Sequence, residues 1–203
     1  MDEIGLYFRA RPNKTLAQGK VKGRNLQKEL VTLALVINST ETNKLELFVI
    51  YTSNQPRCFG RWQPHEYIRW HSNKTTWMKG DIFEVWFLQL NNQFKGQNRK
   101  VIMILDNASS HVVSTAKVGK SRGFSTLELS NMTLVFLPPN VTSVVQPLDQ
   151  GIIASFKIQY KKKLLQWVLS QYDDATLKDL RKAVPNIRHA IIWSYEVWSE
   201  LDA

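Results

Sequence analysis

The sequence predicts a mixed α/β domain, and three observations support that prediction. The 203 residues are 43% apolar and 11% aromatic, which is enough to build a buried core. Short β-rich apolar runs alternate with longer segments that have helical spacing. No apolar run is long enough to span a membrane, and the single cysteine, Cys58, excludes a disulfide framework. We therefore expect one domain over residues 1–203 and no membrane partner.

Three strands are expected in the first quarter of the chain. Residues 4–8 alternate in apolar character, which is typical of a half-buried strand. Residues 30–37 and 45–51 are apolar and β-rich, and the turn-like residues 39–43 between them predict an antiparallel hairpin. The intervening segment 9–28 is polar and basic and contains proline and glycine, so we expect a loop there.

The middle of the chain is expected to hold an irregular region, a helix and a buried strand. Residues 53–79 contain prolines and three tryptophans without a clear period. Residues 81–90 have helical spacing after a plausible start at Gly80. Residues 101–105 are uninterruptedly apolar, which is typical of a strand buried on both faces.

The second half of the chain favours helices around one more strand. The expected elements are a short helix at 112–120 running into a polar insert at 117–130, a strand at 132–137, and helices at 149–170, 176–183 and 186–201. Three antiparallel strands followed by two parallel strands, flanked by helices, is the order of a ribonuclease-H-like sheet. In such a sheet the first and fourth strands lie side by side at the centre.

Three aspartates occupy the positions where that sheet would bring carboxylates together. Asp2 lies on the first strand, Asp106 follows the fourth, and Asp149 begins the long helix. Clustered carboxylates repel one another unless a cation offsets them, and Mg²⁺ and Mn²⁺ prefer such hard oxygen ligands. Two ions held by three carboxylates activate water or a sugar 3′-hydroxyl and stabilise the leaving oxygen.

Each aspartate also has a simpler interpretation. Asp106 could cap the turn after its strand, Asp149 stands where a helix N-cap is common, and Asp2 could be solvated near the terminus. His111 could either face the metal site or satisfy a loop carbonyl.

The charge balance favours a polyanionic partner. The net charge is +10 and the pI is about 9.7, which fits DNA or RNA, with a basic surface kept for solubility as the alternative. A phosphate-contact surface and an ordinary solvated loop are both open for six basic residues near Asp2: Arg9, Arg11, Lys14, Lys20, Lys22 and Arg24. The tryptophans Trp62, Trp70 and Trp77 could stack on bases, although core packing is commoner. The basic cluster 161–163 is too short to be a nuclear address by itself.

Three sequence blocks carry a family resemblance. They are DNASSH from Asp106, FLPPNVTS from Phe136 and QPLDQGI from Gln146. Together they closely resemble the DDE-type transposase domain of the pogo/Tigger group, to which centromere protein B and the jerky-like proteins are related. The opening DEIGL, from Asp2, is similar to the family's first block, with Ile4 in place of its threonine.

The resemblance implies a ribonuclease-H-like fold and metal-dependent cleavage and joining of DNA strands in the nucleus. It makes Asp2, Asp106 and Asp149 the metal ligands of a two-ion site for Mg²⁺ or Mn²⁺. Asn107, His111 and Gln146 are candidates to support those ligands. Self-association would bring paired DNA ends together.

Three departures from the family pattern shape the expectations. The gap between Asp106 and Asp149 is longer than usual, and the polar stretch 117–130 can absorb the excess as a surface loop. The chain begins one residue before Asp2, so we expect a first strand truncated at its N-terminus. We also expect this chain to lack the helix-turn-helix domains that precede this domain in the family. The alternative function is a domesticated, non-catalytic nuclear module that binds DNA or protein, or an inactive transposon fragment.

Overall fold

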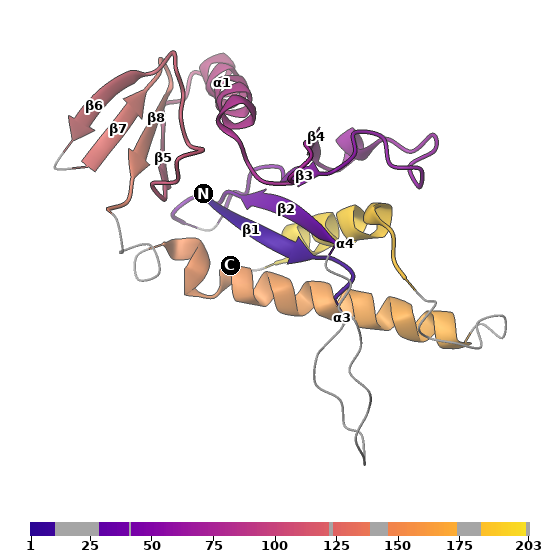
Figure 1. The fold of residues 1–203 in the computed structure, drawn as a ribbon. Coiled ribbons are helices and arrows are strands. Elements are labelled where there is room, and N and C mark those ends of the chain that lie inside the picture. Colours follow the sequence, from indigo (N-terminus) through magenta and orange to yellow (C-terminus); the bar gives the residue numbers. More distant parts are fainter. Residues whose placement is uncertain (11–28, 41, 122–123, 139–145, 174–183, 202–203) are drawn as a thin grey trace.

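Two four-stranded sheets and three long helices form the framework of the protein (Figure 1). This computed structural model describes residues 1–10, 29–40, 42–121, 124–138, 146–173 and 184–201. The strand order is β1-β2-β3-β4 in the first sheet and β5-β8-β7-β6 in the second. The predicted mixed α/β class is therefore confirmed. Within these residues, no helix has both the length and the apolar character that crossing a bilayer requires.

The first sheet contains the three expected strands and one that was missed. Its members are β1 (Asp2–Tyr7), β2 (Leu30–Leu35), β3 (Phe48–Tyr51) and β4 (Arg69–Ser72). The β1–β2 and β2–β3 pairs are antiparallel, as predicted, whereas β4 runs parallel to β3. The missed strand lies inside the region expected to be irregular, and its four residues are too few to show a period-2 pattern.

The second sheet joins a predicted parallel pair to an unpredicted hairpin. The parallel pair is β5 (Val101–Leu105) with β8 (Met132–Phe136). The hairpin is β6 (Lys117–Ser121) with β7 (Phe124–Glu128), and β7 continues the sheet onto β8. The expected short helix and polar insert across this segment are therefore wrong. Because β6 is an edge strand, it needs little apolar character, and its polar residues concealed it.

The two sheets meet at a corner and do not form one continuous sheet. A central β1–β5 ladder was expected from the ribonuclease-H-like order, but the strand pairs of the described residues do not include it. Instead the amino group of Met1 donates to the carbonyl oxygen of Ile104 at 2.8 Å. Beyond that point β1 runs away from β5 (Figure 1), so the consecutive side-by-side residues that a ladder needs are not available. The ribonuclease-H-like sheet order is not confirmed.

The helices cover both faces of the first sheet. α1 (Gly80–Gly96) lies on one face of the first sheet, and α3 (Ile152–Asp173) and α4 (Ile187–Glu200) lie on the other (Figure 1). These three confirm predicted helices with shifted ends. The described residues also contain two short 3-10 turns, η1 (Pro64–Glu66) and η2 (Pro147–Gln150). The expected helix at 176–183 lies outside the described residues.

A glycine divides what was expected to be one helix from residue 149 onward. Gly151 has a φ of 128°, a backbone conformation that residues other than glycine rarely adopt. It separates η2 from α3, so Asp149 lies in η2 and not in the long helix.

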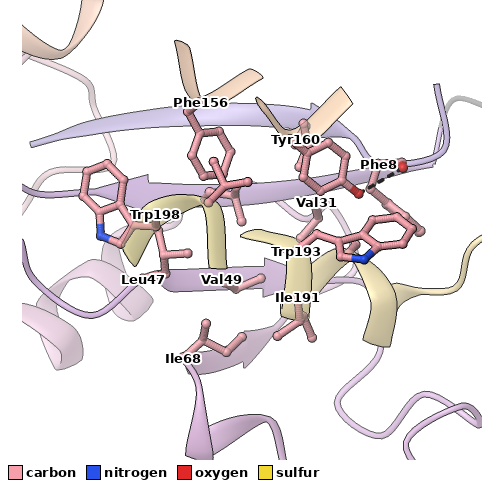
Figure 2. Packing of buried hydrophobic residues seen from close by; sticks show 14 of the residues in the cluster. Phe8, Val31, Leu47, Val49, Ile68, Phe156, Tyr160, Ile191, Trp193 and Trp198 are labelled. Carbon is pink, nitrogen blue, oxygen red and sulfur yellow. Dashed lines mark hydrogen bonds between the residues drawn. The ribbon is translucent and has the colours of Figure 1, made fainter. Parts of the chain in front are cut away.

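Two hydrophobic clusters fill the spaces between these layers. The first lies between the first sheet and helices α3 and α4, where Phe156 and Trp198 pack edge to face (Figure 2). In the same cluster the Tyr160 hydroxyl donates to the carbonyl oxygen of Phe8 at 3.0 Å (Figure 2). The second cluster lies between α1 and both sheets. Successive residues of β2 and β3 therefore alternate between the two clusters.

Strand β5 is buried on one face only. Met103 and Leu105 belong to the second cluster, whereas Ile102 and Ile104 point the other way and are 69% and 47% exposed. The prediction that both faces of this strand are buried is therefore wrong. The apolar run was read correctly as a strand, but its composition could not reveal that one face lacks a covering layer.

Candidate metal centre

Asp2 and Glu3 begin β1 and point to opposite faces of the first sheet. Asp2 pairs with Leu35, whose side chain belongs to the cluster under α3 and α4, and Glu3 pairs with Ala34, which belongs to the cluster under α1. Paired residues of neighbouring strands share a face. Asp2 is thus directed toward the α3 side and Glu3 toward the α1 side.

The electrostatic environment of Asp2 connects it to the other two aspartates. Burial, reinforced by the negative charges of Asp149 and Asp106 and opposed by a hydrogen bond from the Glu3 backbone N–H, raises the pKa of Asp2 to about 6. That hydrogen bond, to Oδ1 of Asp2, measures 2.8 Å. Asp2 is half-buried, so the interpretation of a freely solvated terminal residue does not hold.

Asp106 follows β5 and is fixed by His111. The Nδ1 atom of His111 lies 3.0 Å from Oδ1 of Asp106 and 3.1 Å from its carbonyl oxygen. The hydrogen bond from His111 holds the pKa of Asp106 below its usual value. The interpretation that His111 satisfies a loop carbonyl is therefore confirmed, and the same ring nitrogen also reaches the Asp106 carboxylate. That His111 faces a metal site stays a prediction.

The other nitrogen of His111 contacts a residue that sequence reasoning missed. Nε2 lies 2.8 Å from Oε1 of Glu3, and the imidazole is only 4% exposed. Burial opposes the positive charge, yet the bonds to Asp106 and Glu3 outweigh it and raise the pKa of His111 to about 9. Carboxylates only accept hydrogen bonds, so both ring nitrogens donate and the ring carries a positive charge. The signal for Glu3 was its place beside Asp2 in the first sequence block.

Asp149 is exposed and is carried by η2. Its backbone N–H donates to the carbonyl oxygen of Gln146 at 3.1 Å. The Gln146 side chain is buried, and its Nε2 donates to the carbonyl oxygen of Met1. Gln146 therefore attaches the turn that carries Asp149 to the residue that precedes Asp2.

The donor set is suited to a hard cation, although the ligands do not converge. Among the residues with described positions, no three His, Cys, Asp or Glu side chains gather closely enough to hold a metal ion. Asp2 and Asp106 each have one oxygen engaged in the hydrogen bonds given above. The donors are carboxylates, and the pKa of Asp2 is raised mainly by burial and further by the charges of Asp149 and Asp106. That these three aspartates bind metal stays a prediction.

The remaining sequence candidates have mixed surroundings. Trp70 is buried and its Nε1 donates to the carbonyl oxygen of Asn54, and Trp62 stacks on Tyr67, so core packing accounts for both. Trp77 is 57% exposed, and Asn107 is exposed. Of the six basic residues near Asp2, Arg9 forms an ion pair with Glu29, and the other five lie outside the described residues.

Comparison with known proteins identifies the class of this chain. The family described as DDE superfamily endonuclease matches residues 28–203, and the chain belongs to this family. Its relatives place it in the pogo/Tigger group, as the sequence blocks predicted.

Three of these relatives illustrate the similarity. CENP-B homolog protein 2 of Schizosaccharomyces pombe is 32% identical over 98% of this chain and 38% of its own length. ARS-binding protein 1 of the same organism is 29% identical over 98% of this chain and 37% of its own length. Tigger transposable element-derived protein 4 of Mus musculus is 30% identical over 85% of this chain and 32% of its own length. The chain thus spans less than two fifths of the length of these relatives. No solved structure matches it.

Proposed function

We propose that this chain is a metal-dependent DNA endonuclease and strand-transfer domain in which Asp2, Asp106 and Asp149 are the metal ligands. One observation carries the proposal. The negative charges of Asp106 and Asp149 both act on Asp2, although the three residues come from three separate segments of the chain. A neighbourhood of carboxylates in a protein of net charge +10 fits a cation site that works on a polyanion.

The residues of the chain would hold and orient the reacting groups. Mg²⁺ or Mn²⁺ in a two-ion site would supply activation of water or a 3′-hydroxyl and stabilisation of the leaving oxygen. Asp2, Asp106 and Asp149 would hold the ions through carboxylate oxygens. Gln146 keeps η2 attached to the start of β1, which limits the movement of Asp149 relative to Asp2.

DNA is the partner that charge and ancestry favour. α3 exposes Lys161 and Lys162, whereas Lys163 is paired with Glu196 and Glu200 of α4. Exposed lysines of this kind contact phosphates without reading sequence. A relative named as ARS-binding supports the same partner class. A nuclear location and self-association that brings two DNA ends together belong to this proposal.

A nicking assay on supercoiled plasmid tests the proposal. With Mg²⁺ or Mn²⁺ the chain is expected to nick DNA, and chelation of the metal is expected to stop it. Asp106→Asn should reduce the rate by at least about 100-fold, since even residues that only support a metal ligand can cost that much. Asp81→Asn, an exposed acid in the first turn of α1, is the matched control. Equal nicking by Asp106→Asn and the parent chain would contradict the enzymatic proposal.

A non-catalytic DNA-binding module is the second candidate. It is favoured by the absence of a converged three-ligand cluster among the described residues and by the binding function in the name of one relative. Such a module would bind DNA equally well with and without chelator, would lose affinity steeply with salt, and would not nick plasmid. Asp106→Asn would then leave DNA affinity unchanged.

A further inference from the structure

We propose that Glu3 positions Asp106 through His111, and that this bridge sets the spacing between the two sheets at the metal site. The inference rests on the proposed function, because it concerns the support of a proposed metal ligand. The three residues come from β1 and from the loop after β5. The distances along the bridge are 2.8 Å from Glu3 Oε1 to His111 Nε2 and 3.0 Å from His111 Nδ1 to Asp106 Oδ1.

The bridge stands where the backbone does not connect the sheets. The strand pairs of the described residues do not join β1 to β5, and the main-chain contact there is the hydrogen bond from Met1 to Ile104. A single hydrogen bond can act as a pivot about which the two sheets rotate, so it does not fix the angle between them. A second attachment at a distance from the pivot does fix it. The Glu3–His111–Asp106 bridge is such an attachment, and it ends on a carboxylate of the proposed site.

The imidazole can act as a rigid spacer because its surroundings hold it on several sides. Its ring lies 4.7 Å, centroid to centroid, from the ring of Phe83 of α1, and its backbone N–H donates to the carbonyl oxygen of Ala108 at 3.0 Å. Three residues farther on, Ser114 donates from both its backbone N–H and its hydroxyl to Glu84 of α1, at 2.9 and 2.6 Å. Movement of the ring would break packing as well as hydrogen bonds.

The alternation along β1 explains why Glu3 and Asp2 have different roles. Asp2 is directed toward the side of α3 and η2, and Glu3 toward the side of α1. Glu3 therefore reaches His111 and not the other carboxylates. Glu3 Oε1 accepts from Nε2 of the ring, and Asp106 Oδ1 accepts from Nδ1, so the ring joins the two carboxylates. Glu3 is a positioning residue and touches no proposed reacting group.

The test measures Mn²⁺ affinity and thermal stability on the same variants of the full chain. Glu3→Ala should weaken Mn²⁺ binding about 10- to 100-fold, the range seen when a residue that supports a metal ligand is removed. Glu3→Gln keeps an oxygen acceptor for the imidazole N–H and should recover most of that affinity. Glu196→Ala is the matched control, because it removes a partly exposed glutamate that pairs with Lys163 and lies on α4, on the opposite side of the first sheet from the bridge. It should leave Mn²⁺ affinity unchanged.

The outcomes separate this inference from the proposed function. If the parent binds Mn²⁺ and Glu3→Ala binds it equally well, the positioning role is wrong. If the parent binds no Mn²⁺, the metal-site proposal fails, and NMR of the imidazole then decides on the bridge. In the parent we expect both His111 ring N–H protons to be protected from exchange with water. Loss of protection at Nδ1–H in Glu3→Ala supports positioning through His111, and unchanged protection there overturns it.

Discussion

The hydroxyl of Tyr160 offers a clean test of how the first core is joined to β1. Tyr160 lies on α3, is 1% exposed, and donates to the carbonyl oxygen of Phe8, the residue after β1 (Figure 2). Burial raises the pKa of the Tyr160 phenol above its ordinary value, so the hydroxyl keeps its proton in alkaline solution. The substitution Tyr160→Phe removes this one bond and keeps the ring, so no cavity of consequence is formed.

The expected loss of stability follows from the Phe8 carbonyl oxygen, which loses its hydrogen-bond donor when the Tyr160 hydroxyl is removed. An intramolecular hydrogen bond contributes about 1 kcal/mol net, but a buried partner left unsatisfied costs about 1–3 kcal/mol. Phe8 is fully buried, so water cannot readily replace the lost donor. We therefore expect Tyr160→Phe to lower the free energy of unfolding by about 1–3 kcal/mol. At this chain length that corresponds to a fall in Tm of about 2–4 °C for each kcal/mol.

Urea denaturation followed by tryptophan fluorescence measures this change. Tyr195→Phe is the matched control, since Tyr195 lies on α4 and is 40% exposed, and it should stay within about 0.5 kcal/mol of the parent. If Tyr160→Phe were as stable as Tyr195→Phe, the bond to Phe8 would contribute nothing, and the reasoning from its burial would be refuted.

Two further predictions concern the start of α4 and the two faces of β5. Asn186 caps α4 reciprocally with His189, whose Nδ1 accepts from the Asn186 backbone N–H, and burial followed by the charge of a neighbouring arginine lowers the pKa of His189. The unfolded chain therefore binds the proton more readily, so this contribution to stability is present above about pH 6.5, the ordinary histidine value, and is lost as the pH falls below it. Comparing the pH dependence of urea midpoints should show a smaller acid loss in His189→Gln, and identical curves would contradict the cap. On β5, Met103→Ala should cost about 2–5 kcal/mol and Ile102→Thr less than about 0.5 kcal/mol, because only the first side chain is buried. Similar urea midpoints for the two variants would mean that the exposure of Ile102 is wrong.

Most elements were predictable because the order of apolar and polar residues along each of them matches the pattern of one kind of secondary structure. The strands β2, β3, β5 and β8 are apolar runs, β1 alternates in apolar character, and α1, α3 and α4 show helical spacing. The missed strands have another origin. In β4 four residues are too few for a period, and in β6 the exposed Val118 stands between lysines, so neither apolar run nor alternation is visible. The break between the sheets depends on how Met1 meets Ile104, which no local pattern encodes.

The residues of the candidate site that lie within the family's sequence motifs were predictable. The blocks around Asp106 and Asp149 identified those residues, and the first block identified Asp2. The support of Asp106 by Glu3 was not predictable, because His111 and Glu3 are 108 positions apart and meet only in the fold. Composition also could not reveal that Asp106 turns one oxygen toward an imidazolium.

The second sheet ends in two edge strands of opposite character, and this affects how the chain would aggregate. On β6, Lys117 and Lys120 flank the outer rim, and a strand from another molecule would have to strip water from them to pair there. On β5, the exposed side chains of Ile102 and Ile104 leave an apolar sheet face uncovered beside that edge, and the strand has no charged residue. The lysines that hid β6 from sequence reasoning therefore act as gatekeepers against aggregation. At high protein concentration, aggregation is therefore expected to start at the β5 edge, next to Asp106.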